Sequence, residues 1–252
     1  MNNPFKHAIA EGTPQLGLWN TLCSPTSAEI LADTGFDWLL FDTEHAAIEV
    51  AGLLPLLRAA AGGTASPVVR VAWNDRTLIK KVLDLGAATL LVPYVQTVAE
   101  AEAAVAASKY PPMGTRGVAG STRASRYGRE KNYLHDANDE VCVLLQLETQ
   151  QALQAAAEIA KVTGVDGLFI GPSDLAASMG HMGEPGAEAV QNAIRDTLAI
   201  IQDAGKPAGI LAVNETEALR YIEWGFTFVA VGIDASLLRS AADQLLHRVR
   251  IS

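Results

Sequence analysis

Short apolar runs alternate with longer Ala- and Leu-rich stretches along the whole chain. Each run is continuously apolar, which is the pattern of parallel strands that are buried on both faces. There are eight runs: residues 16–19, 38–41, 67–71, 89–92, 141–147, 167–170, 208–213 and 227–231. Alternating strands and helices predict a parallel sheet. Eight such units in about 250 residues predict its closure into a (β/α)8 TIM barrel, a fold of the α/β class.

Polar residues that favour helix starts separate the runs. They stand at residues 74–75, 173–174 and 234, ahead of helices predicted over 77–85, from 175 and over 235–246. No linker or low-complexity tract divides the chain, so we expect one barrel domain over residues 1–252. The alternative is an open doubly wound sheet, which would carry a Gly-rich dinucleotide turn after the first run, and the sequence has none there.

The connection between the fourth and fifth runs, residues 96–140, is much longer than one helix requires. Its second half, residues 111–133, is rich in Gly, Pro and Arg. Loops of this length in a compact domain are typically functional or lie in an interface.

Composition narrows the class of protein. Hydrophobic residues make up 49% of the 252 residues and charged residues 19%, so the chain can bury a large core. A net charge of −9 argues against nucleic-acid binding, which needs a basic surface. Cys23 and Cys142 are too few for a disulfide framework. Residues 1–11 lack the apolar core of a signal peptide, and no 18-residue apolar stretch occurs, so we expect a cytoplasmic protein without a membrane span.

Polar groups with catalytic potential follow four of the predicted strands. In a barrel these strand ends meet at one rim, where active sites lie. This convergence is the main argument for an enzyme. The groups are Asp42, Glu44 and His45 after the second run, Arg70 in the third, Gln146 and Glu148 at the fifth, and residues 171–174 after the sixth.

Glu148 and Asp174 are the candidate metal ligands. Two carboxylates on adjacent strand ends form a hard oxygen site suited to Mg²⁺ or Mn²⁺, which leave positions for water and substrate. Each residue also has a structural interpretation: Glu148 as an acidic residue of a helix first turn, and Asp174 as a helix N-cap. Zinc is less favoured, since no second histidine or thiolate is near in the pattern.

His45 is the candidate general base, and Asp42 three residues earlier is placed to orient its imidazole. Arg70 can contact a carboxylate or stabilise an enolate oxygen, or form a structural ion pair with Glu44 or Asp42. Residues 171–173 before a helix offer backbone N–H groups to a carboxylate. No lysine stands at the catalytic end of a predicted strand, so a Schiff-base mechanism is disfavoured and enolate stabilisation falls to a metal.

Taken together, these segments resemble the 4-hydroxy-2-oxoheptanedioate aldolase family, which includes 2-keto-3-deoxy-sugar-acid aldolases and belongs with the phosphoenolpyruvate/pyruvate barrels. The resemblance runs from about residue 5 to the C-terminus. The segments that carry it are residues 35–45, 67–70, 90–93, 110–117, 145–149 and 167–175.

The resemblance implies a class II, metal-dependent aldolase that cleaves a 4-hydroxy-2-oxo acid reversibly to pyruvate and an aldehyde. It implies Mg²⁺ or Mn²⁺, with Co²⁺ as a further candidate, and a homohexamer built as a dimer of trimers whose last helix is exchanged between subunits. The residue roles it implies are metal binding by Glu148 and Asp174, enolate stabilisation by Arg70, proton transfer by His45 with Asp42, hydrogen bonding by Gln146, carboxylate binding by the Ser173 and Asp174 N–H groups, an aldehyde pocket at Leu211, and entry of Arg123 into a neighbour's site.

Other functions stay open at this point. A thioester-cleaving relative of the malyl-coenzyme-A lyase type would need a basic nucleotide groove and typically a longer chain, and neither is present. Decarboxylation of oxaloacetate would use the same enolate chemistry. A non-catalytic barrel that binds a 2-oxo acid is disfavoured because His45 and Arg70 accompany a full pair of metal ligands.

Overall fold

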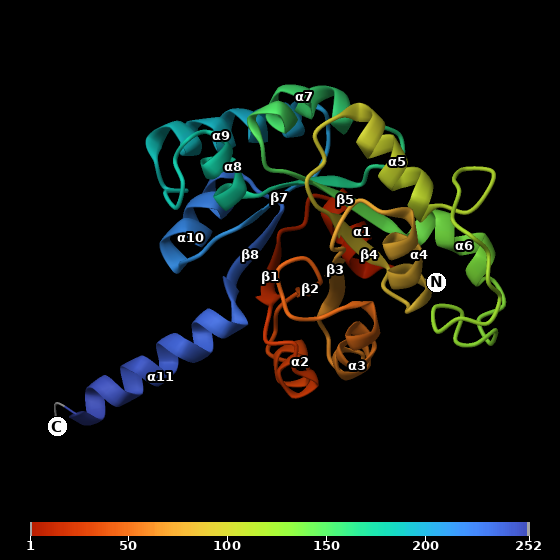
Figure 1. Cartoon of the computed structure of the whole chain (residues 1–252), viewed down its shortest axis with the longest axis horizontal. Coiled ribbons are helices and arrows are strands. Elements are labelled where there is room, and N and C mark those ends of the chain that lie inside the picture. The colour runs from red at the N-terminus through yellow and green to blue at the C-terminus, as the bar shows by residue number, and fades with distance from the viewer. Residues whose placement is uncertain (1, 251–252) are drawn as a thin grey trace.

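The computed structural model describes residues 2–250 and forms a closed barrel of eight parallel strands in sequential order (Figure 1). The predicted TIM barrel is confirmed. Residues 1, 251 and 252 of the predicted 1–252 domain lie outside the described range. The strands are β1 Gln15–Asn20, β2 Trp38–Asp42, β3 Ser66–Arg70, β4 Thr89–Val92, β5 Cys142–Leu147, β6 Gly167–Ile170, β7 Ala208–Leu211 and β8 Phe228–Ile233.

Helices follow each strand and surround the barrel. They are α1 Pro4–Ala10, α2 Pro25–Ala32, α3 Val50–Ala60, α4 Arg76–Asp84, α5 Val98–Ser108, α6 Tyr133–Glu140, α7 Gln150–Ala160, α8 Pro172–Ser178, α9 Glu188–Asp203, α10 Glu215–Trp224 and α11 Asp234–Arg250.

Every predicted apolar run overlaps a strand, and β4 and β6 coincide with their runs residue for residue. Closure comes from pairing between β1 and β8, where the register shifts between Gly17 and Trp19. The predicted start of the helix after β6 was wrong. This helix, α8, begins at Pro172, so Ser173 and Asp174 lie in its first turn rather than ahead of it.

The N-terminal end of the barrel is closed by α1. Phe5 of this helix is 1% exposed, and its ring lies 5.7 Å from that of Phe228 and 5.8 Å from that of Trp38. Gly17 and Gly209 leave the space for these rings, because a Cβ atom at either position would overlap the ring of Trp38 or Phe228. With this end plugged, the barrel interior is reached from the carboxyl ends of the strands.

The long connection predicted between the fourth and fifth strands contains α5, an irregular loop over residues 109–132, and α6. Arg116 anchors the loop with a fully buried side chain. Its Nη2 donates to Asp84 Oδ1 at 2.8 Å and to the Tyr133 hydroxyl at 3.1 Å, and its guanidinium lies 4.4 Å from the Tyr110 ring centroid. The loop is therefore held against the end of α4.

The last helix, α11, leaves the barrel and points away from it (Figure 1). It covers the predicted residues 235–246 and continues to Arg250. Five apolar side chains along it are exposed: Leu237, Leu238, Leu245, Leu246 and Val249. Within residues 2–250 no helix is both long and apolar enough to cross a membrane.

Candidate active site

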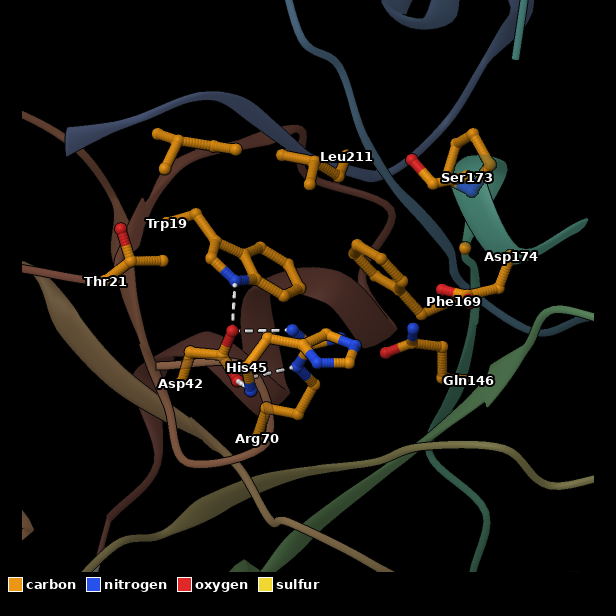
Figure 2. A pocket seen from close by; sticks show the side chains of 13 residues that line it. Trp19, Thr21, Asp42, His45, Arg70, Gln146, Phe169, Ser173, Asp174 and Leu211 are labelled. Atoms are coloured by element: carbon orange, nitrogen blue, oxygen red, sulfur yellow. Dashed lines mark hydrogen bonds and ion pairs between the residues drawn. The ribbon is translucent and has the colours of Figure 1, made fainter. Parts of the chain in front are cut away.

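A pocket of about 220 Å³ opens at the carboxyl ends of the strands. Figure 2 shows Asp42, His45 and Arg70 on one side of it, and Gln146, Ser173 and Asp174 on the other. It therefore brings together side chains from β2, β3, β5 and the β6–α8 turn, as the sequence predicted. Its walls are Trp19, Thr21, Asp42, His45, Arg70, Gln146, Phe169, Gly171, Pro172, Ser173, Asp174, Leu211 and Ile233.

Arg70 is the centre of a buried ion-pair network. Its Nε and Nη2 donate to Asp42 Oδ1 at 2.9 Å and Oδ2 at 2.6 Å, and its Nη1 lies 2.8 Å from Glu44 Oε2. The guanidinium also lies 4.8 Å from the ring centroid of Trp19, whose indole N–H donates to Asp42 Oδ2 at 3.2 Å. The structural ion pairs considered for Arg70 are thus both present, and they fix the guanidinium at the pocket wall.

The two carboxyls beside Arg70 respond differently to burial. Burial raises the pKa of Asp42, but the hydrogen bonds and charge of Arg70 outweigh it, so the net pKa of Asp42 is lowered. Burial also raises the pKa of Glu44. The charge of Arg70 lowers it by less than burial raises it, so the pKa of Glu44 is above its ordinary value. Asp42 is therefore the firmly ionised partner of the arginine.

The predicted pairing of the His45 imidazole with Asp42 was wrong. Asp42 Oδ1 instead accepts the backbone N–H groups of Glu44 at 2.9 Å and His45 at 3.3 Å, and the rest of the carboxylate faces Arg70 and Trp19. The imidazole is 65% exposed, with its Nε2 3.9 Å from Glu44 Oε2. A bidentate arginine binds a carboxylate more strongly than a single imidazole N–H does. Asp42 therefore fixes the loop that carries His45, while the ring stands free at the pocket mouth.

Glu148 adjoins two residues of the pocket wall, Gln146 and Gly171, and is 2% exposed. Its Oε1 accepts the backbone N–H of Tyr94 at 2.8 Å, and its Oε2 accepts a hydrogen bond from the Gln146 amide. Burial raises the pKa of Glu148 to about 7; the Gln146 hydrogen bond opposes this, and the charges of Asp174 and Glu44 add to it. Gly171 is required here, because a Cβ atom at that position would lie 2.5 Å from Glu148 Oε2.

Asp174 and Ser173 lie in the first turn of α8 and line the pocket on the same side as Gln146 (Figure 2). The helix N-cap is Gly171, which has no side chain to cap the helix, so Asp174 is not the cap that its position suggested. Its side chain is therefore free of that role and lines the pocket. The N–H groups of a helix first turn have no partner inside the helix and can meet an anion.

The residues present fit a divalent cation. Within residues 2–250 no group of three or more His, Cys, Asp or Glu side chains could hold a metal by itself. What the site offers is the pair Glu148 and Asp174; burial raises the pKa of Glu148, and the charge of Asp174 adds to this. The hydrogen-bond partners of Glu148 are neutral, and Gln146 Oε1 is buried without a hydrogen-bond partner. Mg²⁺ and Mn²⁺ commonly use one or two carboxylates and take their other ligands from water and substrate.

The remaining pocket wall is apolar. Leu211 at the end of β7 lines it, as predicted, together with Phe169 and Ile233. Trp19, whose ring lies 5.7 Å from that of Phe169, was not predicted as a site residue. Its position at the end of the first apolar run was the available signal, since a search for charged strand ends passes over an indole.

Arg123 does not line the pocket. Its Nη1 donates to Leu85 O at 2.6 Å and its Nη2 to Leu57 O at 3.3 Å. These carbonyls lie at the C-terminal ends of α4 and α3, which is the end of the barrel opposite the pocket. Burial lowers the pKa of Arg123, and the charge of Arg58 adds to this. Within its own chain Arg123 ties the long loop to two helices; its entry into a neighbouring subunit's site stays a prediction.

The chain is similar in sequence and in structure to known aldolases and their family members. Residues 15–241 match the family model described as HpcH/HpaI aldolase/citrate lyase. A 4-hydroxy-2-oxo-heptane-1,7-dioate aldolase from Klebsiella pneumoniae is 53% identical over 98% of this chain and 94% of its own length. A pyruvate aldolase from Rhizobium etli is 53% identical over 98% of this chain and 97% of its own. The crystal structure of an HpcH/HpaI aldolase/citrate lyase family protein from Burkholderia cenocepacia superposes with a TM-score of 0.97 at 39% identity, covering 99% of this chain and 100% of that one.

Proposed function

This chain belongs to the HpcH/HpaI aldolase/citrate lyase family, and from that premise we propose that its rim pocket cleaves a 4-hydroxy-2-oxo acid reversibly to pyruvate and an aldehyde. The chain is thus a carbon–carbon lyase of the class II aldolase type. The observation that carries the proposal is the arrangement at one rim of Asp174 and the fixed guanidinium of Arg70, which line the pocket, and of Glu148. Glu148 is a buried carboxyl with neutral hydrogen-bond partners, and it lies directly against Gln146 and Gly171 of the pocket wall.

Glu148 and Asp174 are the proposed ligands of a divalent cation, Mg²⁺ or Mn²⁺, with Co²⁺ as a further candidate. When bound, such an ion supplies Lewis-acid polarisation of the 2-oxo group. The raised pKa of Glu148 supports the assignment, because its buried charge lacks a compensating positive group that a cation would provide.

Arg70 is the proposed stabiliser of the developing oxyanion. A guanidinium carries five N–H donors, and three of its nitrogens already contact Asp42 and Glu44. N–H donors therefore remain for a substrate oxygen, and the ion pairs hold the group in place before the reaction starts. Preorganised donors of this kind lower a barrier without reorganising during the reaction.

His45 is the proposed general base, supported by an exposed imidazole at the pocket mouth. In the cleavage direction a base accepts the proton of the C4 hydroxyl and the C3–C4 bond breaks. The electron pair of that bond forms the enolate of pyruvate, which is then protonated at C3, and the C4 fragment leaves as the aldehyde. Asp42 contributes by holding the backbone of the His45 loop and by fixing Arg70.

Substrate binding is assigned to both sides of the pocket. The first-turn N–H groups of Ser173 and Asp174 are the proposed site for the substrate carboxylate, and the Gln146 amide is a proposed hydrogen-bond partner beside Glu148. Leu211, in the apolar wall with Phe169, is proposed to contact the aldehyde portion.

For the assembly, we assign a homohexamer, a dimer of trimers, in which α11 packs on a neighbouring subunit and Arg123 approaches that subunit's site. The exposed leucines of α11 support this, because a helix with such a face needs a partner. Free Cys23 and Cys142 fit a reducing, cytoplasmic location.

The test follows the methyl protons of pyruvate by NMR in deuterium oxide, which requires no choice of aldehyde. Exchange should disappear after chelation and return with Mg²⁺ or Mn²⁺. The Glu148→Gln variant should lose exchange, whereas Glu158→Gln, the same change on the exposed surface of α7, should retain it. Exchange that survives complete metal removal would contradict the metal assignment. Tight pyruvate binding without exchange would instead indicate a binding protein.

A further inference from the structure

Tyr94, in the loop after β4, has an unusual backbone. Its φ is 57°, in the left-handed region, although it is not a glycine. Side chains disfavour this region, and an aromatic residue stays there only when surrounding contacts hold it. Strain of this kind at the proposed catalytic rim suggests that the left-handed backbone makes a contact that an ordinary backbone could not make.

The dependent contact is with the proposed metal ligand. The left-handed turn directs the Tyr94 N–H to Glu148 Oε1 at 2.8 Å, and the next N–H, that of Val95, reaches the Gln146 carbonyl at 3.1 Å. Glu148 Oε2 is held separately by the Gln146 side chain. Each carboxylate oxygen therefore has its own donor, and the orientation of the carboxylate depends on the Tyr94 backbone.

The Tyr94 side chain packs on Trp73. The two rings stack with centroids 5.8 Å apart and an interplanar angle of 28°. Trp73 is 54% exposed and Tyr94 39%, and neither lines the pocket. Because both rings remain this exposed, they add little to the hydrophobic core. The main effect of their contact is to fix the two loops relative to each other.

The Trp73 loop is itself well anchored. Trp73 O accepts the N–H of Asp75 at 2.8 Å, Asp75 caps the start of α4, and Asn74 donates to Glu100 O at 2.9 Å. Trp73 is thus a fixed surface against which the Tyr94 ring can rest.

We propose that Trp73 is a positioning residue: by stacking on the Tyr94 ring it holds Tyr94 in the left-handed conformation, keeps that N–H directed at Glu148, and so sets the affinity of the site for a divalent cation. The inference rests on the proposed function through the role given to Glu148. Groups that orient a metal ligand from outside the coordination shell typically alter affinity by 10–100-fold.

The experiment is a double-mutant cycle on the full-length, metal-free protein, with Mn²⁺ binding followed by water-proton relaxation. Trp73→Ala should weaken Mn²⁺ binding about tenfold when Tyr94 is present. In a Tyr94→Gly background the same change should have little effect, because glycine adopts the left-handed conformation without help. Trp73→Phe, which keeps a ring, should restore most of the affinity.

A readout without metal accompanies the cycle. Trp73→Ala should speed hydrogen exchange of the Tyr94 amide, which Trp73→Phe should protect. Unchanged Mn²⁺ affinity in Trp73→Ala, or an equal loss in both backgrounds, would overturn the positioning role while leaving the proposed function intact. Wild-type protein that binds no Mn²⁺, or Glu148→Gln protein that binds it normally, would instead overturn the metal site, and this inference with it.

Discussion

Asp42 and Arg70 are register partners on the adjacent strands β2 and β3, and their side chains meet in a two-pronged ion pair at 2.9 and 2.6 Å. Backbone pairing thus brings the two charges to the same height on the barrel rim. The pair is buried, with side-chain exposures of 7% for Arg70 and 1% for Asp42. Each residue therefore depends on the other for its charge to be tolerated.

Asp42→Asn should destabilise the protein by about 3 kcal/mol, because removing one partner of a buried ion pair leaves the other charge uncompensated. Chemical denaturation at fixed protein concentration measures the loss. Glu44→Gln is the matched control: it contacts the same guanidinium, but Glu44 is more exposed and its pKa is raised rather than lowered. We expect a loss below about 1 kcal/mol there, and equal losses in both variants would contradict the central place of Asp42.

The contribution of Asp42 should depend on pH. Its folded pKa lies below the ordinary value of 3.8 because Arg70 outweighs the effect of burial. A lowered carboxyl pKa stabilises the fold at pH values above the ordinary one, and this stabilisation disappears as the pH falls through the folded pKa. The difference in Tm between wild type and Asp42→Asn should therefore be large at pH 7 and shrink near pH 3. A gap that is constant over this range would show that ionisation plays no part.

Glu148→Gln should abolish lyase activity, by at least about 100-fold, without destabilising the metal-free protein. The amide has the same shape as the carboxyl, and it removes a buried acid whose charged form burial disfavours. Thermal unfolding in the presence of chelator, beside an assay with added Mg²⁺, separates the two effects. A variant with a markedly lower Tm in chelator would indicate that the carboxyl is structural.

Arg116→Lys should cost about 2 kcal/mol of stability, although the charge is kept. A lysine cannot reproduce the flat guanidinium that stacks on Tyr110 while donating to Asp84 and the Tyr133 hydroxyl. Arg129→Lys, on an exposed residue of the same loop, is the control and should change the stability by less than about 0.5 kcal/mol. If the two variants have similar denaturation midpoints, Arg116 does not anchor the loop.

Charged side chains in place of exposed leucines of α11 should dissociate the proposed hexamer. Leu245 and Leu246 are 58% and 49% exposed, and Leu245→Glu/Leu246→Glu should lower the mass found by analytical ultracentrifugation. His247→Gln, at an exposed position on the opposite side of the same helix, should leave the mass unchanged. If the doubly charged variant keeps the wild-type mass, α11 does not hold subunits together.

The sequence predicted the barrel because each strand is buried on both faces, which leaves a continuous apolar run between helical stretches. The local sequence also predicted the helix start at Asp75. Its side chain accepts the N–H groups of Thr77 and Leu78 there. At α8 the prediction failed although a signal was present: Pro172 suits the first helical position, and the capping interpretation of Ser173 and Asp174 ignored it.

The side-chain partners within the site were harder to predict. Asp42 and His45 are close in sequence, whereas Arg70 is 28 residues from Asp42. Arg70 nevertheless binds the Asp42 carboxylate, because the two residues are register partners on adjacent strands. The stack of Trp73 on Tyr94 likewise joins two loops whose proximity follows only from the closed barrel. Such contacts have no local signature, because spacing along the chain does not determine which groups meet across neighbouring strands.

The plug formed by α1 bears on the order of events in turnover. Because Phe5 fills the N-terminal end of the barrel, substrates and products enter and leave through the same pocket opening. Under the proposed assignments, the three-carbon product forms next to the buried Glu148 and the aldehyde forms toward the partly exposed Leu211. We therefore expect the aldehyde to depart before pyruvate, and in the synthetic direction we expect pyruvate to bind first. Product-inhibition patterns should accordingly be those of a compulsory-order mechanism.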